Sequence, residues 1–393
     1  MKNCKYCLYD SNHPFGMAYD NEKCLGCITH DEKYNLDWNN RYTYLKKEFK
    51  KAKNKSKTYD CVVPVVGDAE DYFVVQELLK LGMNPLIVSV NSYFYNDIGW
   101  TNLHNLITHF DVDSWVYNPE KQTYQELIRT SLRKYNHMYL PWIQLHTSFP
   151  VHVANEKSIP LVVWGGNQSV EQVGKFSHND SVEMSSWSRV EHDLFGIDTE
   201  SLIGNGAQVD ERKLNYYYYP INLKTLSRKV KGIYLSNYLP WDPLKQNHSM
   251  VSKHGFKPEA NPYSFDPYER AGSSVYYGIH DLLKYQRLGY RKITDHCTRE
   301  IRHGRLTKKE GIEIKNKFNY RKVNINPFFN WLNVTKSGVD WFVKHRLNKS
   351  FDLISYNKVD FDKIIIPKKL DELISDSSKP ISEIITYGKG IKI

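Results

Sequence analysis

CVVPVVGDAEDYFVVQELLKLG, residues 61–82, predicts a buried strand, a short loop and an amphipathic helix in direct succession. The strand covers Cys61 to Val66, where valine dominates and only Pro64 departs from what a central strand prefers. The loop is GDAED, and the helix ends near Gly82, because glycine readily takes the left-handed conformation that follows many helices. This succession is the first half of a βαβ unit.

Strand and helix patterns continue to alternate as far as residue 240. The predicted strands are 85–90, 114–117, 160–165 and 232–236, and the predicted helices are 100–110 and 124–135. Short apolar strands separated by helices indicate parallel pairing, because each helical crossover returns the chain to the same edge of the sheet. We therefore predict an α/β fold with a parallel sheet, followed by a mostly helical C-terminal part.

The 393-residue chain has a formal net charge of +10 and a mean hydropathy of −0.60. Its longest apolar stretches have the length of strands, so we expect no membrane-spanning helix, and a cytoplasmic protein. The segment from Leu45 to Lys57 holds seven lysines and one glutamate. Such a run is usually the solvated face of a helix or a linker, although it also attracts anionic substrates or nucleic acids.

Four of the six cysteines lie at the start of the chain, as two C-x-x-C pairs that are sixteen residues apart. They are Cys4, Cys7, Cys24 and Cys27. Two chelating pairs of thiolates close a tetrahedral shell around Zn²⁺, with no position left for catalysis. Two disulfides or four free thiols are the alternatives, but the start MKNCKYCLYD has no apolar signal core that would lead to an oxidising compartment. The motif predicts one structural zinc ion.

Four regions follow from these patterns. We expect a zinc-binding knuckle in residues 1–40, a basic linker helix in 41–58, the sheet domain in 59–240, and a helical region for substrate or partners in 241–393.

Several longer blocks are unusual in composition: LGMNPLIVSVN, NLHNLITHFDVD, IPLVVWGGN, LPWDPLKQN and KITDHCTREIRHGRLTKKEG. With the paired C-x-x-C and YDCVVPV, they resemble the N-acetyl sugar amidotransferase family of surface-polysaccharide biosynthesis, over a span from Cys4 to about Gly311. The resemblance implies that residues 59–240 form a nucleotide-binding domain of the PP-loop ATP-pyrophosphatase superfamily.

The resemblance also implies a reaction that uses ATP and Mg²⁺. The amide oxygen of an activated N-acetyl sugar is adenylated, and ammonia then converts the acetamido group to acetamidino. Partners similar to a glutaminase and a cyclase subunit would supply the ammonia. No nucleic acid takes part in such a reaction.

The family's nucleotide loop reads Ser-Gly-Gly-Lys-Asp-Ser and is followed by Tyr-Phe. The nucleotide-binding positions that the resemblance implies here are Gly67, Asp68, Ala69, Glu70, Asp71, Tyr72, Gly165 and Asn167. Residues 66–71 differ from the family's loop at five of the six positions, the first being Val66 in place of serine. The lysine and both serine hydroxyls of the family are therefore missing, and the loop has two acids more than the family's loop. A second departure is Gly166, where the family commonly has glutamate. Without the resemblance, the loop is an ordinary connection whose acids cap a helix dipole.

Asp295, Glu300 and Arg302 stand where the family has its T/S-D…E-I-R segment. The resemblance implies that the two acids orient substrate or bind metal and that Arg302 holds a phosphate or a carboxylate. An internal ion-pair network on helical turns is the structural alternative. We therefore predict the ATP-dependent amidotransferase, with a catalytically inactive homologue that binds sugar or acts as a scaffold as the alternative. A nucleic-acid-modifying PP-loop enzyme is a third hypothesis, which the blocks after residue 160 disfavour.

Overall fold

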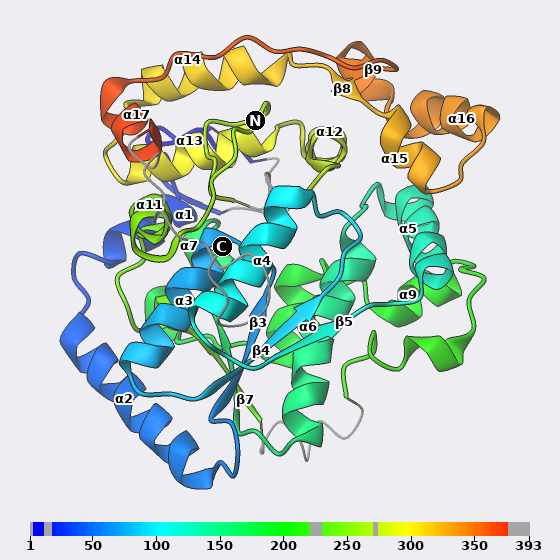
Figure 1. The fold of residues 1–393 in the computed structure, drawn as a ribbon. Coiled ribbons are helices and arrows are strands. Elements are labelled where there is room, and N and C mark those ends of the chain that lie inside the picture. The colour runs from blue at the N-terminus through cyan, green and yellow to red at the C-terminus, as the bar shows by residue number, and fades with distance from the viewer. Residues whose placement is uncertain (1–2, 12–17, 221–229, 270–273, 376–393) are drawn as a thin grey trace.

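A parallel sheet of five strands forms the centre of the molecule (Figure 1). The computed structural model describes residues 3–11, 18–220, 230–269 and 274–375. The strand order is β5-β4-β3-β6-β7, so the strand of this sheet that comes first in the chain, β3, lies in the middle. The strands are β3 (Cys61–Val65), β4 (Pro85–Val90), β5 (Ser114–Tyr117), β6 (Leu161–Trp164) and β7 (Lys231–Tyr234). The predicted α/β class with a parallel sheet is confirmed.

Pro64 lies in the central strand despite the preference against proline there. β3 pairs with β4 from Cys61 to Val65, whereas its recorded pairing with β6 is Val62 with Val162. Proline has no N–H to donate, which agrees with the short ladder on the β6 side.

Helices cover both faces of the sheet. The helices in this part of the chain are α1 (Leu25–Glu32), α2 (Trp38–Lys55), α3 (Ala69–Lys80), α4 (Asp97–His109), α5 (Lys121–Tyr135), α6 (Leu140–Glu156), α7 (Gln168–Glu171), α8 (Ser186–Ser188), α9 (Thr199–Gly204) and α11 (Pro243–His254). Alternate strand residues enter two separate cores. Val62 and Leu86 pack with α5 and α6, whereas Val63 and Ile87 pack with α2, α3, α4 and α11. This alternation divides the apolar side chains of each strand between two helical layers.

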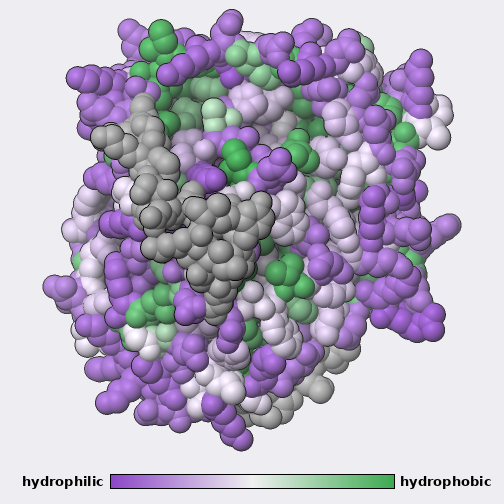
Figure 2. All heavy atoms as spheres, in the orientation of Figure 1, coloured by the Kyte–Doolittle hydropathy of each residue, from purple (hydrophilic) through white to green (hydrophobic). Residues whose placement is uncertain are grey.

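The C-terminal part is helical and lies over one end of the sheet, at the top of Figure 1 in yellow to red. Its elements are α12 (Tyr277–Leu288), α13 (Lys292–Arg302), α14 (Lys308–Asn319), β8 (Val323–Asn324), α15 (Asn326–Trp331), α16 (Lys336–Arg346), β9 (Ile354–Ser355) and α17 (Lys368–Ser375). Hydrophilic side chains cover much of the face in Figure 2. Among the described helices, none has the length and apolar character needed to cross a bilayer.

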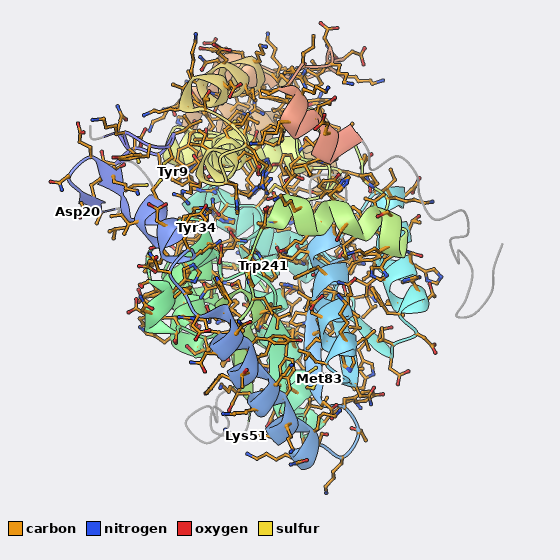
Figure 3. The ribbon with its side chains drawn as sticks, turned by 90° about the vertical axis from the view of Figure 1, so that its left-hand side faces the viewer. Tyr9, Asp20, Tyr34, Lys51, Met83 and Trp241 are labelled. Atoms are coloured by element: carbon orange, nitrogen blue, oxygen red, sulfur yellow. The ribbon has the colours of Figure 1, made fainter. Side chains whose placement is uncertain are left out.

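The N-terminal knuckle packs beside α13, although the two are nearly 300 residues apart in the chain. β1 (Tyr19–Asp20) and β2 (Lys23–Cys24) form a small antiparallel hairpin that leads into α1. Tyr9 donates a hydrogen bond of 2.7 Å to Asp295 in α13, across 286 positions. Figure 3 shows the knuckle, marked by Tyr9 and Asp20, on the outside of the molecule next to the C-terminal helices. The knuckle therefore joins the start of the chain to the C-terminal helical part.

Candidate functional site

Two loops meet where the sheet changes direction, between the neighbouring strands β3 and β6. From β3 the chain proceeds to β4 and β5 on one side, and it later adds β6 and β7 on the other. The first loop, residues 66–71, leads from β3 into α3, and the second, residues 165–167, follows β6. In open parallel sheets ligands bind at this switch point, outside the carboxyl ends of the strands.

Asp71 turns its side chain back into its own loop. Its Oδ2 accepts hydrogen bonds from the backbone N–H groups of Val66 at 2.7 Å, Gly67 at 2.8 Å and Asp68 at 3.1 Å. With Asp68 it also forms a capping box at the start of α3. Gly67 has a φ of +85°, and a Cβ there would lie 2.8 Å from the backbone nitrogen of Leu103, so only glycine fits. The N–H groups that converge in this loop therefore already have an acceptor, the Asp71 side chain.

Glu70 bridges the two loops at the switch point. Its Oε1 accepts a hydrogen bond of 2.9 Å from the N–H of Gly166. A Cβ at Gly165 would lie 2.2 Å from the same Oε1 atom, so the glycine leaves the room that the Glu70 carboxylate fills. Beyond it, the indole Nε1 of Trp241 would lie 2.9 Å from a Cβ at Gly166. The space between β3 and β6 is thus filled by side chains of this chain.

Burial acts against the charges of both acids. It raises the pKa of Glu70 to about 7, and the negative charges of Asp68, Glu269 and Glu171 add to the effect. Burial likewise raises the pKa of Asp71 to about 8, against the opposing influence of the hydrogen bonds from the Val66 and Asp68 amides. The switch point is therefore an acidic, poorly solvated environment, which is unfavourable for an added phosphate.

Replacing Glu70 with glutamine will stabilise the protein at pH 8 by about 2–3 kcal/mol and change little at pH 5. The folded-state pKa of about 7 lies above the ordinary value of 4.5. Stability that depends on this group is therefore fully present below about pH 4.5 and is lost as the pH rises to about 7. The difference in free energy of unfolding between variant and wild type, measured in urea from pH 5 to 8, checks this. Glu313→Gln, on the exposed side of α14, is the control and should show no such trend.

The other predicted nucleotide-binding residues have structural partners. Ala69 is fully buried, and Tyr72 donates a hydrogen bond of 2.6 Å to the backbone oxygen of Asn102 in α4. The side chain of Asn167 caps the short helix α7 and donates to the Val182 oxygen at 3.1 Å. Their assignment to nucleotide binding stays a prediction.

The three predicted catalytic residues lie on α13 and take part in ion pairs and hydrogen bonds within the protein. Asp295 accepts from Tyr9 and is paired with Lys284. Burial would raise the pKa of Asp295, but the positive charges of Lys284 and Lys292 outweigh it and hold that pKa below its ordinary value.

Glu300 belongs to a second ion-pair group on the same helix. It contacts Arg299 through its Oε1 at 2.6 Å and pairs with Arg305 through its Oε2. Arg305 continues to Asp242 with two hydrogen bonds of 2.8 and 2.9 Å. α13 therefore carries an internal ion-pair network, the structural alternative for these residues, and their catalytic role stays a prediction.

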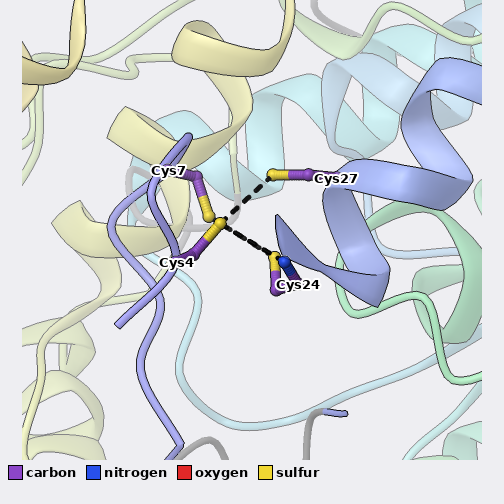
Figure 4. A group of neighbouring side chains, drawn as sticks. All are labelled: Cys4, Cys7, Cys24 and Cys27. Atoms are coloured by element: carbon purple, nitrogen blue, oxygen red, sulfur yellow. Dashed lines mark hydrogen bonds between the residues drawn. The ribbon is translucent and has the colours of Figure 1, made fainter. Parts of the chain in front are cut away.

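Four cysteines from two segments surround one point at the N-terminus (Figure 4). All four are buried, and their sulfur atoms lie within 4.8 Å of one another. The Sγ atoms of Cys4 and Cys27 are 4.0 Å apart, and those of Cys7 and Cys24 are 3.6 Å apart. Tetrahedral zinc with Zn–S bonds of about 2.3 Å separates its sulfurs by about 3.8 Å. The cluster therefore has the spacing and the donor set of a metal site.

Arg302 connects this cluster to α13. Its guanidinium lies 3.4 Å from the Cys27 sulfur and 3.7 Å from the Cys24 sulfur, and it donates to the Gln172 oxygen at 2.6 Å. Hydrogen bonding to Cys27 is the main cause that lowers the pKa of Cys24 to about 6. A buried cation next to thiolates offsets part of their negative charge.

A second group of possible metal ligands was not predicted from the sequence. Asp266, Glu269 and His296 bring their ligand atoms within 4.8 Å of one another. Two cations already pair with these carboxylates, because Arg299 lies 2.7 Å from Asp266 and Lys292 lies 3.3 Å from Glu269. The group is therefore a charge-balanced network, and since Asp266 and Glu269 belong to no motif, the sequence held no signal for it.

Residues 261–364 match the family model described as LPS biosynthesis protein WbpG-like, C-terminal domain. This part of the chain is similar to proteins of lipopolysaccharide biosynthesis. The match covers α12 to β9, including α13 with its ion-pair network. A comparison of the chain with curated proteins found no match. The match supports a role in lipopolysaccharide biosynthesis and leaves the reaction open.

Proposed function

We propose that this chain serves lipopolysaccharide or related surface-polysaccharide biosynthesis as a catalytically inactive homologue of the sugar amidotransferases, acting as a scaffolding subunit. The observation that carries the proposal is the carboxylate of Asp71, which accepts three backbone N–H groups of the loop that binds nucleotide in that family. The match of residues 261–364 supports the pathway.

Two features of the switch point disfavour ATP. The convergent amides that would meet a phosphate already have the Asp71 carboxyl group as their acceptor, so ATP must displace Asp71 before it can bind. A phosphate there would also approach the buried Glu70, and a pair of like charges at about 4 Å costs about 1–4 kcal/mol at moderate dielectric. The lysine and hydroxyls that compensate such charge in the family are absent from residues 66–71.

The contacts of α13 support the scaffolding role. Asp295 binds the knuckle through Tyr9, and Arg302 binds it through the sulfurs of Cys24 and Cys27. Residues that would handle substrate in a related enzyme thus connect distant parts of this chain. With one Zn²⁺ held by the four cysteines, the knuckle would act as a rigid structural module.

The alternative is the ATP-dependent amidotransferase itself, acting on an activated N-acetyl sugar with ammonia from a glutaminase partner. The position of the two loops at the switch point favours it, because this is where nucleotides bind in parallel sheets. It requires that Asp71 leave the loop amides and that Mg²⁺ offset Asp68 and Glu70.

Isothermal calorimetry with ATP and Mg²⁺ separates the two functions. We expect no binding to the wild type at millimolar nucleotide. The variant Asp68→Gly/Ala69→Lys/Glu70→Asp/Asp71→Ser restores the family's loop apart from its first serine, and it should bind ATP with a Kd below about 1 mM, about 4 kcal/mol of binding free energy. ATP binding by the wild type, together with pyrophosphate release in the presence of ammonia and N-acetyl sugars, would establish the amidotransferase instead.

A further inference from the structure

α2 has one face that consists almost entirely of lysine. Leu45, Phe49 and Ala52 point inward and are buried against the sheet layer. The exposed side carries Lys46, Lys47, Lys50, Lys51, Lys53 and Lys55, which we call the lysine face. The 18-residue helix extends for about 27 Å. Figure 3 shows α2 on the outside of the molecule, with Lys51 near its end.

The charge of this face is not compensated by nearby acids. Residues 45–57 hold seven lysines and one glutamate, so they contribute +6 of the net charge of +10. The glutamate, Glu48, is only 11% exposed and pairs with Lys51 at 2.7 Å and Lys231 at 2.9 Å. Within the described ranges, no acidic side chain pairs with Lys46, Lys47 or Lys50. A lysine face without acids attracts anionic partners.

Two tyrosine rings of α2 already have neighbours within the protein. Tyr44 stacks on Tyr238 with ring centroids 5.9 Å apart, and the ammonium of Lys231 lies 5.7 Å from its ring. The ammonium of Lys46 lies 4.4 Å from the ring of Tyr42. The lysine face itself has no arginine, the residue that reads bases and grips phosphates in a fork. The positive charge of the lysine face is spread over several flexible side chains, and such a distribution suits a partner surface that carries many mobile anions.

We propose that the lysine face is a docking surface for an anionic phospholipid membrane. The exposed lysines in the C-terminal half of α2, from Lys46 to Lys55, match a flat layer of lipid phosphates, and each lysine near such a surface adds to binding. The choice of a membrane rests on the proposed role in lipopolysaccharide biosynthesis, whose products are built on lipid. The contact would be peripheral, because none of the described helices can span a bilayer.

Vesicle sedimentation with the full chain tests this proposal. We expect binding to vesicles of equal parts phosphatidylglycerol and phosphatidylcholine at 50 mM salt, no binding to pure phosphatidylcholine, and loss of binding at 500 mM salt. The variant Lys46→Gln/Lys47→Gln/Lys50→Gln should partition about 100-fold more weakly. Glutamine keeps the helix propensity, so its circular dichroism should match the wild type.

The matched control is Lys336→Gln/Lys344→Gln/Lys349→Gln, which removes the same charge from exposed positions in and after α16. It should bind vesicles like the wild type. An equal loss of vesicle binding in both variants would mean that only the net charge of the protein matters, and it would overturn the assignment of the lysine face as the docking surface. Failure of the wild type to bind anionic vesicles would also overturn it, including when the chain binds an RNA oligonucleotide instead. Neither result depends on ATP, so the proposed function is judged separately.

Discussion

Replacing Cys24 with serine will release the bound metal and lower the free energy of unfolding by at least about 3 kcal/mol. Serine is a poor zinc ligand, and the three remaining thiols cannot close a tetrahedral shell. The loss extends beyond the knuckle, because Arg302 in α13 contacts the sulfurs of Cys24 and Cys27. Atomic absorption should find one zinc per wild-type chain and none in the variant, and the melting temperature should fall by about 4 °C or more.

Cys61→Ala is the control for this prediction. Cys61 is a buried cysteine in β3, outside the four-cysteine cluster. The control should keep its zinc, even if the lost packing lowers its stability. Unchanged zinc content in Cys24→Ser would contradict the assignment of the site, and chelation of the wild type without any change in melting temperature would contradict its structural role.

Replacing Asp71 with alanine will destabilise the protein by about 3 kcal/mol, because three backbone N–H groups lose their acceptor at once. The first turn of α3 also loses its reciprocal cap with Asp68. Chemical unfolding at pH 7 measures the loss. Amide hydrogen exchange should show faster exchange at Val66, Gly67 and Asp68 in particular.

Asp71→Asn distinguishes the lost acceptor from the lost charge. Asparagine keeps one side-chain oxygen that can accept from the same amides, and it carries no charge that burial opposes, so this variant should not show the loss of stability expected of Asp71→Ala. Equal losses in the two variants would show that the negative charge, and not the hydrogen-bond acceptor, holds the loop. A loss below about 0.5 kcal/mol in Asp71→Ala would mean that water replaces the carboxylate without cost.

The strands of the sheet can be predicted from the sequence, because each is a short apolar run between turn residues. The predictions 85–90 and 114–117 coincide with β4 and β5, and the others differ from the structure by one or two residues at an end. The order of the strands was not predictable in the same way, since it depends on how distant segments pack.

α6 was missed for a physical reason. Twelve of its seventeen residues are buried, so it has no polar face and shows no helical period. Pro150 in its interior also speaks against a helix. Such a segment can be recognised only from its surroundings in the fold.

The location of the candidate site followed from the sequence, but its internal contacts did not. A strand followed by a short loop and a helix predicts a loop at the carboxyl edge of a sheet. From the sequence, the acids of the loop are either charges that face a bound phosphate or caps of a helix dipole. The structure turns Asp71 inward as a cap of α3. The spacing Asp68-x-x-Asp71 resembles a capping box and was the available signal.

The contact between the knuckle and α13 also sets an order of events during translation. Cys24 and Arg302 are 278 positions apart, so at 5–20 residues per second roughly 15–55 s pass between the synthesis of the first and of the second. For most of that interval Asp295, which accepts from the Tyr9 hydroxyl, has not yet been made, whereas Gln172, which donates to the same hydroxyl at 3.1 Å, is made earlier. Closure of the N-terminus against α13 is therefore a late step, which can occur only after most of the polypeptide has left the ribosome.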